Sequence, residues 1–216
     1  MKRWQVIALC AAVVAVAAYF YFYRGGFGFG GSHSGAPGQS ESAGAQPAKI
    51  QWQVISRPED GFRLEMPADP KDLQVPAYNE MGGTEPVKML FSSPDGDTTF
   101  AVTWQDNPPV ARVNNRVPDR TLDQARDGML ARTQTTLVSE SKLTTLPYPG
   151  RDITAKNSEG GFLDARMLYV NDRLYTLMAL FPTQSARHEQ DVIRFFNSFA
   201  PQRVSPTLPE ATPKGT

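Results

Sequence analysis

The chain begins with an apolar run that no charged side chain interrupts. Residues 6–23 are 18 uncharged positions, and as a helix rising about 1.5 Å per residue they would extend about 27 Å, close to the hydrocarbon thickness of a bilayer. Aromatic residues fill positions 19–23 and Arg24 follows them. Because aromatic rings favour the membrane interface, the pattern predicts a transmembrane signal anchor over residues 1–24.

The basic residues around this run set its expected orientation. Lys2 and Arg3 precede the apolar run, whereas only Arg24 follows it closely. Basic residues are enriched on the cytoplasmic side of membrane segments. We therefore expect a single-pass protein with its N-terminus in the cytoplasm and the rest of the chain outside it.

Two alternatives to a retained anchor remain open. Ala15 and Ala17 are small residues in the spacing of a signal-peptidase site, so the run could be cleaved. Cys10 could carry a lipid, although Leu9 is a bulky residue where a lipobox usually has a small one. In the anchor interpretation Cys10 is simply a small apolar residue of a lipid-facing helix.

Two segments have the composition of unfolded chain. Residues 25–49 are rich in Gly, Ser, Ala and Pro, and such a segment buries too little apolar surface to offset the entropy lost on ordering. Residues 201–216 contain four prolines. We predict a flexible linker over residues 25–49 and a disordered Pro-rich tail over residues 201–216, which leaves residues 50–200 as one folded domain.

Short alternating segments in this domain predict β-strands. The clearest is residues 62–66, where Phe, Leu and Met alternate with Arg and Glu. Pro67 and Pro70 are expected to end it, and turn residues separate it from its neighbours. The predicted strands before the hairpin described next are residues 52–56, 62–66, 87–93, 98–104, 137–146 and 152–156.

The strongest local prediction is a β-hairpin near the C-terminus. Residues 162–170 and 173–181 are its arms, and Asn171 and Asp172 are its two-residue turn. The second arm has apolar residues on both of its faces. A strand of that kind is expected at the centre of a sheet that is covered on both sides.

Two helices complete the expected fold. Thr121 and Gln124 fit a capping box at the start of the first helix, and residues 107–120, which contain three prolines, are expected to form the loop before it. Ser185 is the expected N-cap of a second helix over residues 186–198. Its apolar stripe, continued just past its end, is Val192, Phe195, Phe196 and Phe199. The predicted class is α+β, an α/β/α sandwich with a central, mostly antiparallel sheet, preceded by one transmembrane helix.

The domain resembles a known group of bacterial envelope domains. The residues that carry the resemblance are Gly61 to Pro67 with Pro70 behind them, the segment Arg173-Leu174-Tyr175, and the closing run from Phe195 to Phe199. They are similar to the Mog1/PsbP-like superfamily, including its DcrB-like members. The resemblance implies an α/β/α sandwich that works as a binding or accessory module, and it brings no catalytic residues.

Charge and side-chain inventory exclude several functions. The 22 basic and 22 acidic residues cancel, and residues 51–199 alone carry 16 basic and 20 acidic side chains, which disfavours binding to nucleic acid. One Cys and two His exclude a disulfide framework and a four-ligand Cys/His zinc site. His188 is expected at the surface, and Asp95 and Asp97 are expected in a turn rather than in a calcium site.

One basic run is a candidate interaction site. Arg112, Arg116 and Arg120 lie in the expected loop and form a possible partner-binding loop, and Arg126 and Arg132 continue the run. Long loops in compact domains are often functional. Acidic residues between these arginines partly compensate the charge, however, and a solvated face is the preferred interpretation of the run.

These observations predict a non-catalytic binding or accessory domain. We expect it to be anchored in the bacterial inner membrane by one span, with its C-terminal domain in the periplasm and with a protein partner in the cell envelope. No catalytic residue, cofactor or metal is predicted. The alternative is an enzyme or small-ligand carrier that uses carboxylates and the loop arginines of the same domain.

Overall fold

The computed structural model describes residues 50–78, 84–106 and 118–202. Their elements, in chain order, are β1 (Trp52–Arg57), β2 (Phe62–Pro67), β3 (Lys71–Tyr78), β4 (Thr84–Ser92), β5 (Thr99–Asp106), α3 (Pro118–Thr133), β6 (Thr136–Lys142), β7 (Gly150–Lys156), β8 (Phe162–Val170), β9 (Arg173–Phe181), the 3-10 turn η2 (Gln184–Ala186), α4 (Glu189–Ser198) and β10 (Ala200–Pro201). In the part of the chain that the structure describes, no helix has the length and apolar character needed to cross a bilayer. The predicted anchor, residues 1–24, and linker, residues 25–49, lie outside the described residues.

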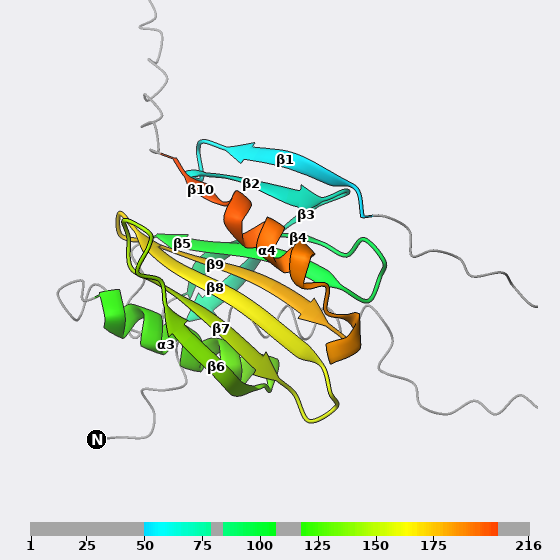
Figure 1. Ribbon diagram of the computed structural model, residues 1–216. Coiled ribbons are helices and arrows are strands. Elements are labelled where there is room, and N and C mark those ends of the chain that lie inside the picture. Colours follow the sequence, from blue (N-terminus) through cyan, green and yellow to red (C-terminus); the bar gives the residue numbers. More distant parts are fainter. Residues whose placement is uncertain (1–49, 79–83, 107–117, 203–216) are drawn as a thin grey trace, which may run out of the picture.

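Seven strands form the main sheet, in the order β3-β4-β5-β9-β8-β7-β6 (Figure 1). Every pairing between neighbouring strands is antiparallel. The expected mostly antiparallel sheet is therefore confirmed. Strand β9 occupies the middle of the order, as its two apolar faces predicted.

The predicted hairpin is present with the predicted arms. Strands β8 and β9 pair from Phe162 with Phe181 to Val170 with Arg173. The turn residues Asn171 and Asp172 have φ values of 49° and 63°. Positive φ at both turn positions is the signature of the type I′ turn, whose twist matches that of the strands it joins.

A second, smaller sheet has the order β1-β2-β10. Strand β2 alternates as predicted, with Phe62, Leu64 and Met66 buried. The short β10 pairs with β2 at Arg63 and Phe62. The C-terminal end of the domain is thus tied to the strand hairpin that opens it.

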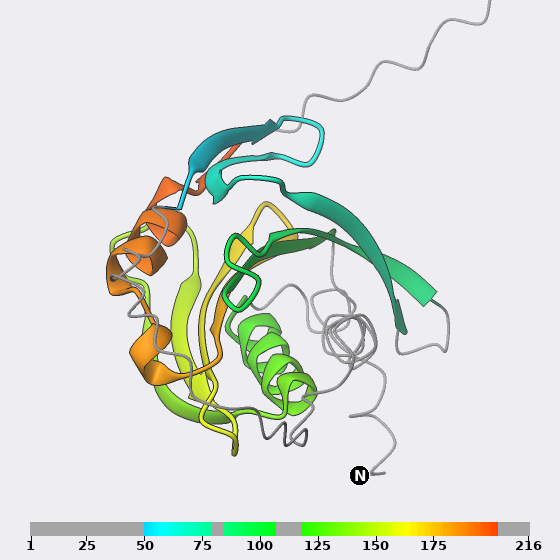
Figure 2. The same ribbon diagram turned by 90° about the vertical axis from the view of Figure 1, so that its right-hand side faces the viewer.

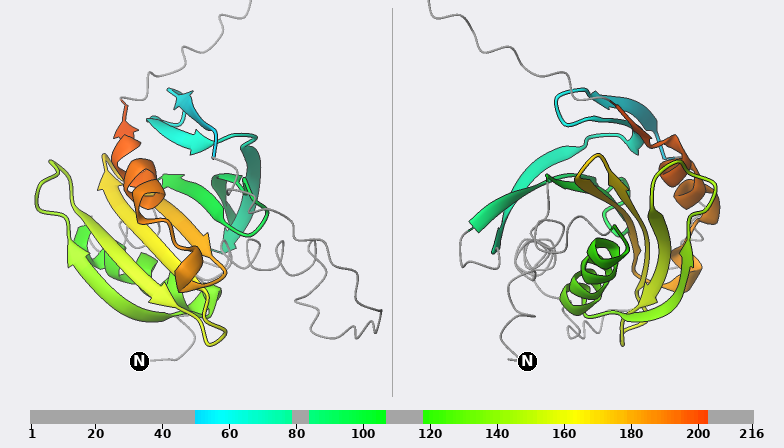
Figure 3. Two further views of the ribbon diagram at one scale, coloured as in Figure 1. Left: turned by 45° about the vertical axis from the view of Figure 1, so that its right-hand side comes forward. Right: turned by 90° about the vertical axis from the view of Figure 1, so that its left-hand side faces the viewer.

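The two faces of the main sheet have separate hydrophobic cores. Helix α4 and the small sheet cover one face, and α3 lies against the other, concave face (Figures 2 and 3). The core on the α4 face is largely aromatic. Its aromatic members that are buried are Phe62, Phe100, Trp104, Tyr175, Phe181, Phe195, Phe196 and Phe199. The core on the α3 face includes four methionines and three alanines, namely Met89, Met129, Met167, Met178, Ala101, Ala155 and Ala165.

Both helices begin at other residues than predicted. Helix α3 begins at Pro118, and Thr121 is a buried residue inside it, so the predicted capping box is wrong. Proline suits the first helical position because its fixed φ is helical and its missing N–H would have no helical partner there. Helix α4 begins at Glu189, and Thr183, not Ser185, accepts the capping hydrogen bond, which belongs to η2.

Strand β3 was not predicted. Pro70 was interpreted as the end of the preceding strand, but a new strand begins at Lys71 and contains Pro76. Strand β3 is an edge strand of the main sheet. One side of an edge strand has no partner strand, so such a strand tolerates a proline, which has no backbone N–H to donate. The predicted strand over residues 137–146 is also shorter, because β6 ends at Lys142.

Candidate functional site

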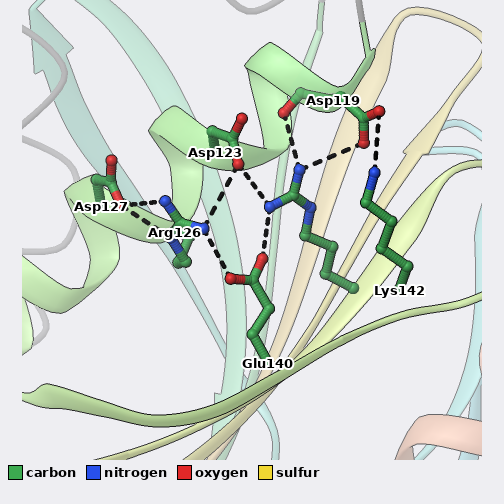
Figure 4. Close-up of polar contacts among 7 residues, drawn as sticks. Asp119, Asp123, Arg126, Asp127, Glu140 and Lys142 are labelled. Atoms are coloured by element: carbon green, nitrogen blue, oxygen red, sulfur yellow. Dashed lines mark hydrogen bonds and ion pairs between the residues drawn. The ribbon is translucent and has the colours of Figure 1, made fainter.

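A cluster of charged side chains joins helix α3 to the neighbouring strands β6 and β7 (Figure 4). The helix contributes Asp119, Asp123 and Asp127, which are spaced four residues apart and therefore lie along one side of it. Strand β7 contributes Arg151, whose side chain is only 6% exposed. Strand β6 contributes Glu140, which reaches toward the same helix face.

Arg151 is the centre of this ion-pair cluster. Its Nη1 donates to Oδ1 of Asp123 at 2.5 Å and to Oε1 of Glu140 at 2.5 Å. Its Nη2 donates to the carbonyl oxygen of Asp119 at 3.2 Å and to Oδ1 of the same residue at 3.3 Å. The guanidinium thus bridges the first two turns of α3 to β6, with several charge-assisted hydrogen bonds.

Two further cations extend the cluster to both sides. Nη1 of Arg126 donates to Oε2 of Glu140 at 2.7 Å, and its Nε donates to Oδ1 of Asp127 at 2.8 Å. Nζ of Lys142 lies 3.2 Å from Oδ2 of Asp119. Glu140 therefore lies between two guanidinium groups, and the first turn of α3 is held by two strands.

The surrounding cations lower the pKa of two carboxyl groups of the cluster, those of Glu140 and Asp119. Burial alone would raise the pKa of Glu140, but hydrogen bonds from Arg151 and Arg126 outweigh it and lower the pKa. The hydrogen bond from Lys142 is the main cause of the lowered pKa of Asp119. Four carboxylates and three cations make up the cluster, so their charges nearly cancel. The arrangement is suited to docking a helix rather than to attracting a free ion.

A second polar cluster lies where the turn between β1 and β2 meets the main sheet. Oδ1 of the buried Asp60 accepts hydrogen bonds from Nζ of Lys88 at 2.7 Å and from Nε1 of Trp104 at 3.0 Å. The backbone carbonyl oxygen of Asp60 accepts hydrogen bonds from the hydroxyl of Tyr175 at 3.1 Å and from Nη1 of Arg173. This turn is therefore fixed to three strands, β4, β5 and β9.

The residues on either side of positions 107–117 are held by ion pairs. Asp106, the last residue of β5, forms an ion pair with Arg173 of β9. Asp119, the second residue of α3, forms ion pairs with Arg151 and Lys142. The segment between them is thus flanked by two charge-braced residues at one end of the sheet. Rigid flanks are the usual support of a binding loop.

The arginines predicted as a partner-binding loop fall in different places. Arg112 and Arg116 lie outside the described residues. Arg120 is exposed, and it belongs to the first turn of α3 rather than to a loop. The two arginines that continue the basic run do not form a solvated face. Arg126 is engaged in the ion-pair cluster, and Arg132 is buried.

The other candidates from the sequence have structural roles. Oδ1 of Asp95 accepts the backbone N–H groups of Asp97 and Thr98 at 2.9 and 2.6 Å, so the turn interpretation is confirmed. His188 is exposed just before α4, as expected. Over residues 50–78, 84–106 and 118–202, no three His, Cys, Asp or Glu side chains come together as metal ligands.

Sequence reasoning missed the central residues of both clusters. Arg151 lies just before the predicted strand over residues 152–156, and Asp60 lies among the turn residues before the predicted strand over residues 62–66. A single buried charge has no local signature, so neither residue was singled out. One signal was available for the ion-pair cluster. The i, i+4 spacing of Asp119, Asp123 and Asp127 marks an acidic helix side, which requires cations on the element packed against it.

Comparisons with known proteins concern the fold. No protein-family model and no curated protein sequence matches the chain. Among solved structures, the chain is similar to the solution structure of cyanobacterial PsbP (CyanoP) from Synechocystis sp. PCC 6803, with a TM-score of 0.45 and 13% sequence identity. That likeness covers 76% of this chain and 98% of the CyanoP chain.

Proposed function

We propose that the chain is a single-pass protein of the bacterial inner membrane that presents a non-catalytic binding domain in the periplasm. In this proposal residues 1–24 are a retained signal anchor, residues 25–49 are a tether, and the domain is a DcrB-like member of the PsbP-like folds. The anchor rests on the uncharged run of residues 6–23 with Lys2 and Arg3 before it.

The observation that carries the binding role is that the residues on either side of positions 107–117 are held by ion pairs. Asp106 is held by Arg173 on one side, and Asp119 is held by Arg151 and Lys142 on the other. Charged residues fixed on rigid elements on both sides of a long connection are a common arrangement for recognition. We infer that this segment, with Arg112, Arg116 and the adjacent Arg120, meets a protein partner of the cell envelope.

The partner expected from this arrangement carries an acidic surface. Three arginines within nine residues offer planar guanidinium groups that pair well with carboxylates. The domain as a whole is mildly acidic, with 16 basic and 20 acidic side chains over residues 51–199. Attraction is therefore local to this segment and is not a property of the whole surface.

The binding role is tested by capture from membrane extract with the full chain. A variant with Arg112, Arg116 and Arg120 all changed to Glu should lose a cross-linked partner. A matched control changes Arg63, Lys71 and Lys156, which are exposed on β2, β3 and β7, to Glu and should retain it. Capture of the same partner by both variants would contradict the proposal. The proposal would also be contradicted if no partner were captured and the domain showed a hydrolase activity that depends on one of its carboxylates.

The topology is tested separately with a reporter fused after Thr216. A reporter that is active only in an oxidising compartment should be active in the full chain. Deleting residues 1–24 should abolish this activity and release the domain from the membrane fraction. Activity of a cytoplasmic reporter at the same position would contradict the proposed orientation.

A further inference from the structure

The edge strands of the two sheets differ in how well they are protected against pairing with another chain. In the described residues the edges are β3 and β6 of the main sheet and β1 and β10 of the small sheet. Native proteins commonly blunt an edge with a proline, with charged side chains, with a bulge or with a short strand. Strand β3 contains Pro76, β6 has a register shift between Leu137 and Ser139, and β10 has only two residues.

Strand β1 has none of these protective features. It pairs with β2 in an unbroken register from Trp52 to Arg57, and positions 52–56 contain no proline and no charged residue. Trp, Val and Ile, which are common in strands, fill three of these five positions. Val54, in the middle, is 53% exposed although it is apolar. Figure 1 shows β1 as the outermost strand of the small sheet.

The pairing with β2 shows which backbone groups of β1 face its open side. The N–H of Ala68 donates to the carbonyl oxygen of Gln51 at 2.8 Å, so the carbonyl of Gln51 faces β2. Trp52 lies opposite Pro67, which has no N–H to donate, and this agrees with a Trp52 whose backbone faces the other way. Because successive residues direct their backbone groups to alternate sides of a strand, positions 52, 54 and 56 face the open side. Within the described part of the chain, β1 pairs with β2 alone.

We propose that two copies of the chain pair through β1, in antiparallel orientation around a two-fold axis at Val54, so that their small sheets form one continuous sheet. In this register Val54 lies opposite Val54 of the second copy, and Trp52 lies opposite Ser56 of the second copy. The three open positions of each strand then form about six hydrogen bonds between the copies. Such an interface is isologous, because each copy contributes the same surface.

The absence of charge on β1 suits it to pairing with itself. Like charges directly opposite each other destabilise a strand pair, and positions 52–56 bring none together. Strand β6 differs in this respect, because self-pairing around Glu140 or around Lys142 would place identical charges opposite each other. Pairing around Val54 also covers an exposed apolar side chain on each copy, which is favourable.

The position of β1 next to the proposed tether favours a second copy as the occupant. Only Ile50 and Gln51 separate β1 from the tether proposed for residues 25–49. Each copy anchored in one membrane would therefore present β1 at the same tether length, and confinement to that membrane raises the effective concentration of one edge near another. This step rests on the anchoring in the proposed function, whereas the assignment of the open edge does not.

Disulfide cross-linking tests the interface and its register. Cys10 is the only cysteine of the chain, so the full chain with Cys10→Ser is a background without thiols. In isolated membranes treated with copper phenanthroline, Val54→Cys should cross-link two copies, because opposite residues of an antiparallel pair lie within the Cα separation of a disulfide. Val138→Cys and Ile193→Cys are matched controls, since the native side chains are 51% and 50% exposed, and they should cross-link several-fold more slowly.

Three cross-linking results would overturn the proposal. Equal rates at the three positions would indicate random collision, and the fastest rate at Val138 would place the contact at β6. Cross-linking of Val54→Cys to a different membrane protein, and not to a second copy, would show that β1 has another occupant.

A charge exchange at Val54 tests the same contact without a covalent bond. Two differently tagged full chains are co-expressed, and co-capture through one tag is measured. Val54→Lys in both copies should reduce co-capture several-fold, because the two lysines would lie opposite each other. Val54→Lys in one copy and Val54→Glu in the other should restore it. Val138→Lys in both copies is the control and should leave co-capture unchanged.

Failure of the charge exchange is distinct from failure of the proposed function. Co-capture that survives Val54→Lys in both copies, or that the Lys and Glu combination does not restore, overturns the interface. Neither this readout nor the cross-link depends on the reporter after Thr216 or on the variant of Arg112, Arg116 and Arg120. The interface can therefore fail while the topology and the partner-binding segment hold, and the reverse is equally measurable.

Discussion

Oδ1 of Asp60, in the turn between β1 and β2, accepts a hydrogen bond from the indole Nε1 of Trp104 on β5 at 3.0 Å. The same oxygen accepts from Lys88, and the backbone carbonyl of Asp60 accepts from Tyr175. Because Asp60 itself is only 4% exposed, one turn residue connects the small sheet to the main sheet through buried polar contacts.

Replacing this carboxylate should destabilise the domain. Asp60→Ala leaves the indole N–H of Trp104 buried without a partner, and we expect the free energy of unfolding to fall by about 2–3 kcal/mol. Urea denaturation followed by Trp fluorescence measures the change. Glu59→Ala, at the exposed neighbouring position, should stay within about 0.5 kcal/mol of the parent chain. Equal effects of the two substitutions would show that the turn is not a specific connection.

Acid should weaken the attachment of α3. The lowered pKa values of Glu140 and Asp119 mean that their contribution to stability is complete at neutral pH, above the unfolded-state pKa values. It is lost as the pH falls through the lower folded-state values. Glu140→Gln should lower the free energy of unfolding by about 1–2 kcal/mol at pH 7, and the difference from the parent chain should shrink as the pH falls and vanish below the lowered folded-state pKa of Glu140.

Urea midpoints of both chains across this pH range check the acid prediction. The control is Glu159→Gln, an exposed residue of the turn between β7 and β8, which should follow the parent chain throughout. A difference between Glu140→Gln and the parent chain that stays constant from neutral into acid pH would mean that the lost interaction does not depend on ionisation.

The two cores should respond differently to truncation. Phe195 is fully buried and makes edge-to-face contact with Phe100 at a centroid distance of 5.4 Å. Phe195→Ala should cost about 3–5 kcal/mol, whereas Met129→Ala should stay near 2 kcal/mol because the flexible methionine surroundings can close around the gap. Ile193→Ala is the control: half of the native side chain is exposed, so this substitution should leave the free energy of unfolding nearly unchanged. Urea denaturation measures all three, and equal losses for Phe195 and Met129 would contradict the distinction between the cores.

Periodicity was sufficient for most of the fold because it reports burial directly. The two apolar faces of β9 predicted its central position, and the alternation of Phe62, Leu64 and Met66 predicted the buried face of β2. Strand β3 was missed because Pro70 was interpreted as an end. Whether a proline ends a strand depends on which neighbour the chain pairs with next, and local sequence does not contain that information.

The candidate site was less predictable than the fold. The interaction of Arg151 with Asp119 spans 32 positions of sequence, and that of Arg173 with Asp60 spans more than 100. Such pairs form only after the sheet order is set, so they follow from topology and not from spacing. The helix start was misplaced for a related reason. Thr121 has the chemistry of a cap, but Pro118 begins the helix three residues earlier, which moves Arg120 from the expected loop onto α3.

The turn between β8 and β9 gives a test of backbone strain in isolation from packing. Asn171 is exposed and has a φ of 49°, a region that asparagine and glycine tolerate better than other residues. Asn171→Ala should lower the free energy of unfolding by about 1 kcal/mol, whereas Asn171→Gly should change it by less than about 0.5 kcal/mol. Asp172 is less suitable for this test because its carboxylate also accepts the hydroxyl of Tyr169 at 3.1 Å. Urea midpoints distinguish the two substitutions, and equal stability of the Ala and Gly chains would mean that the turn relaxes to a type without positive φ at this position.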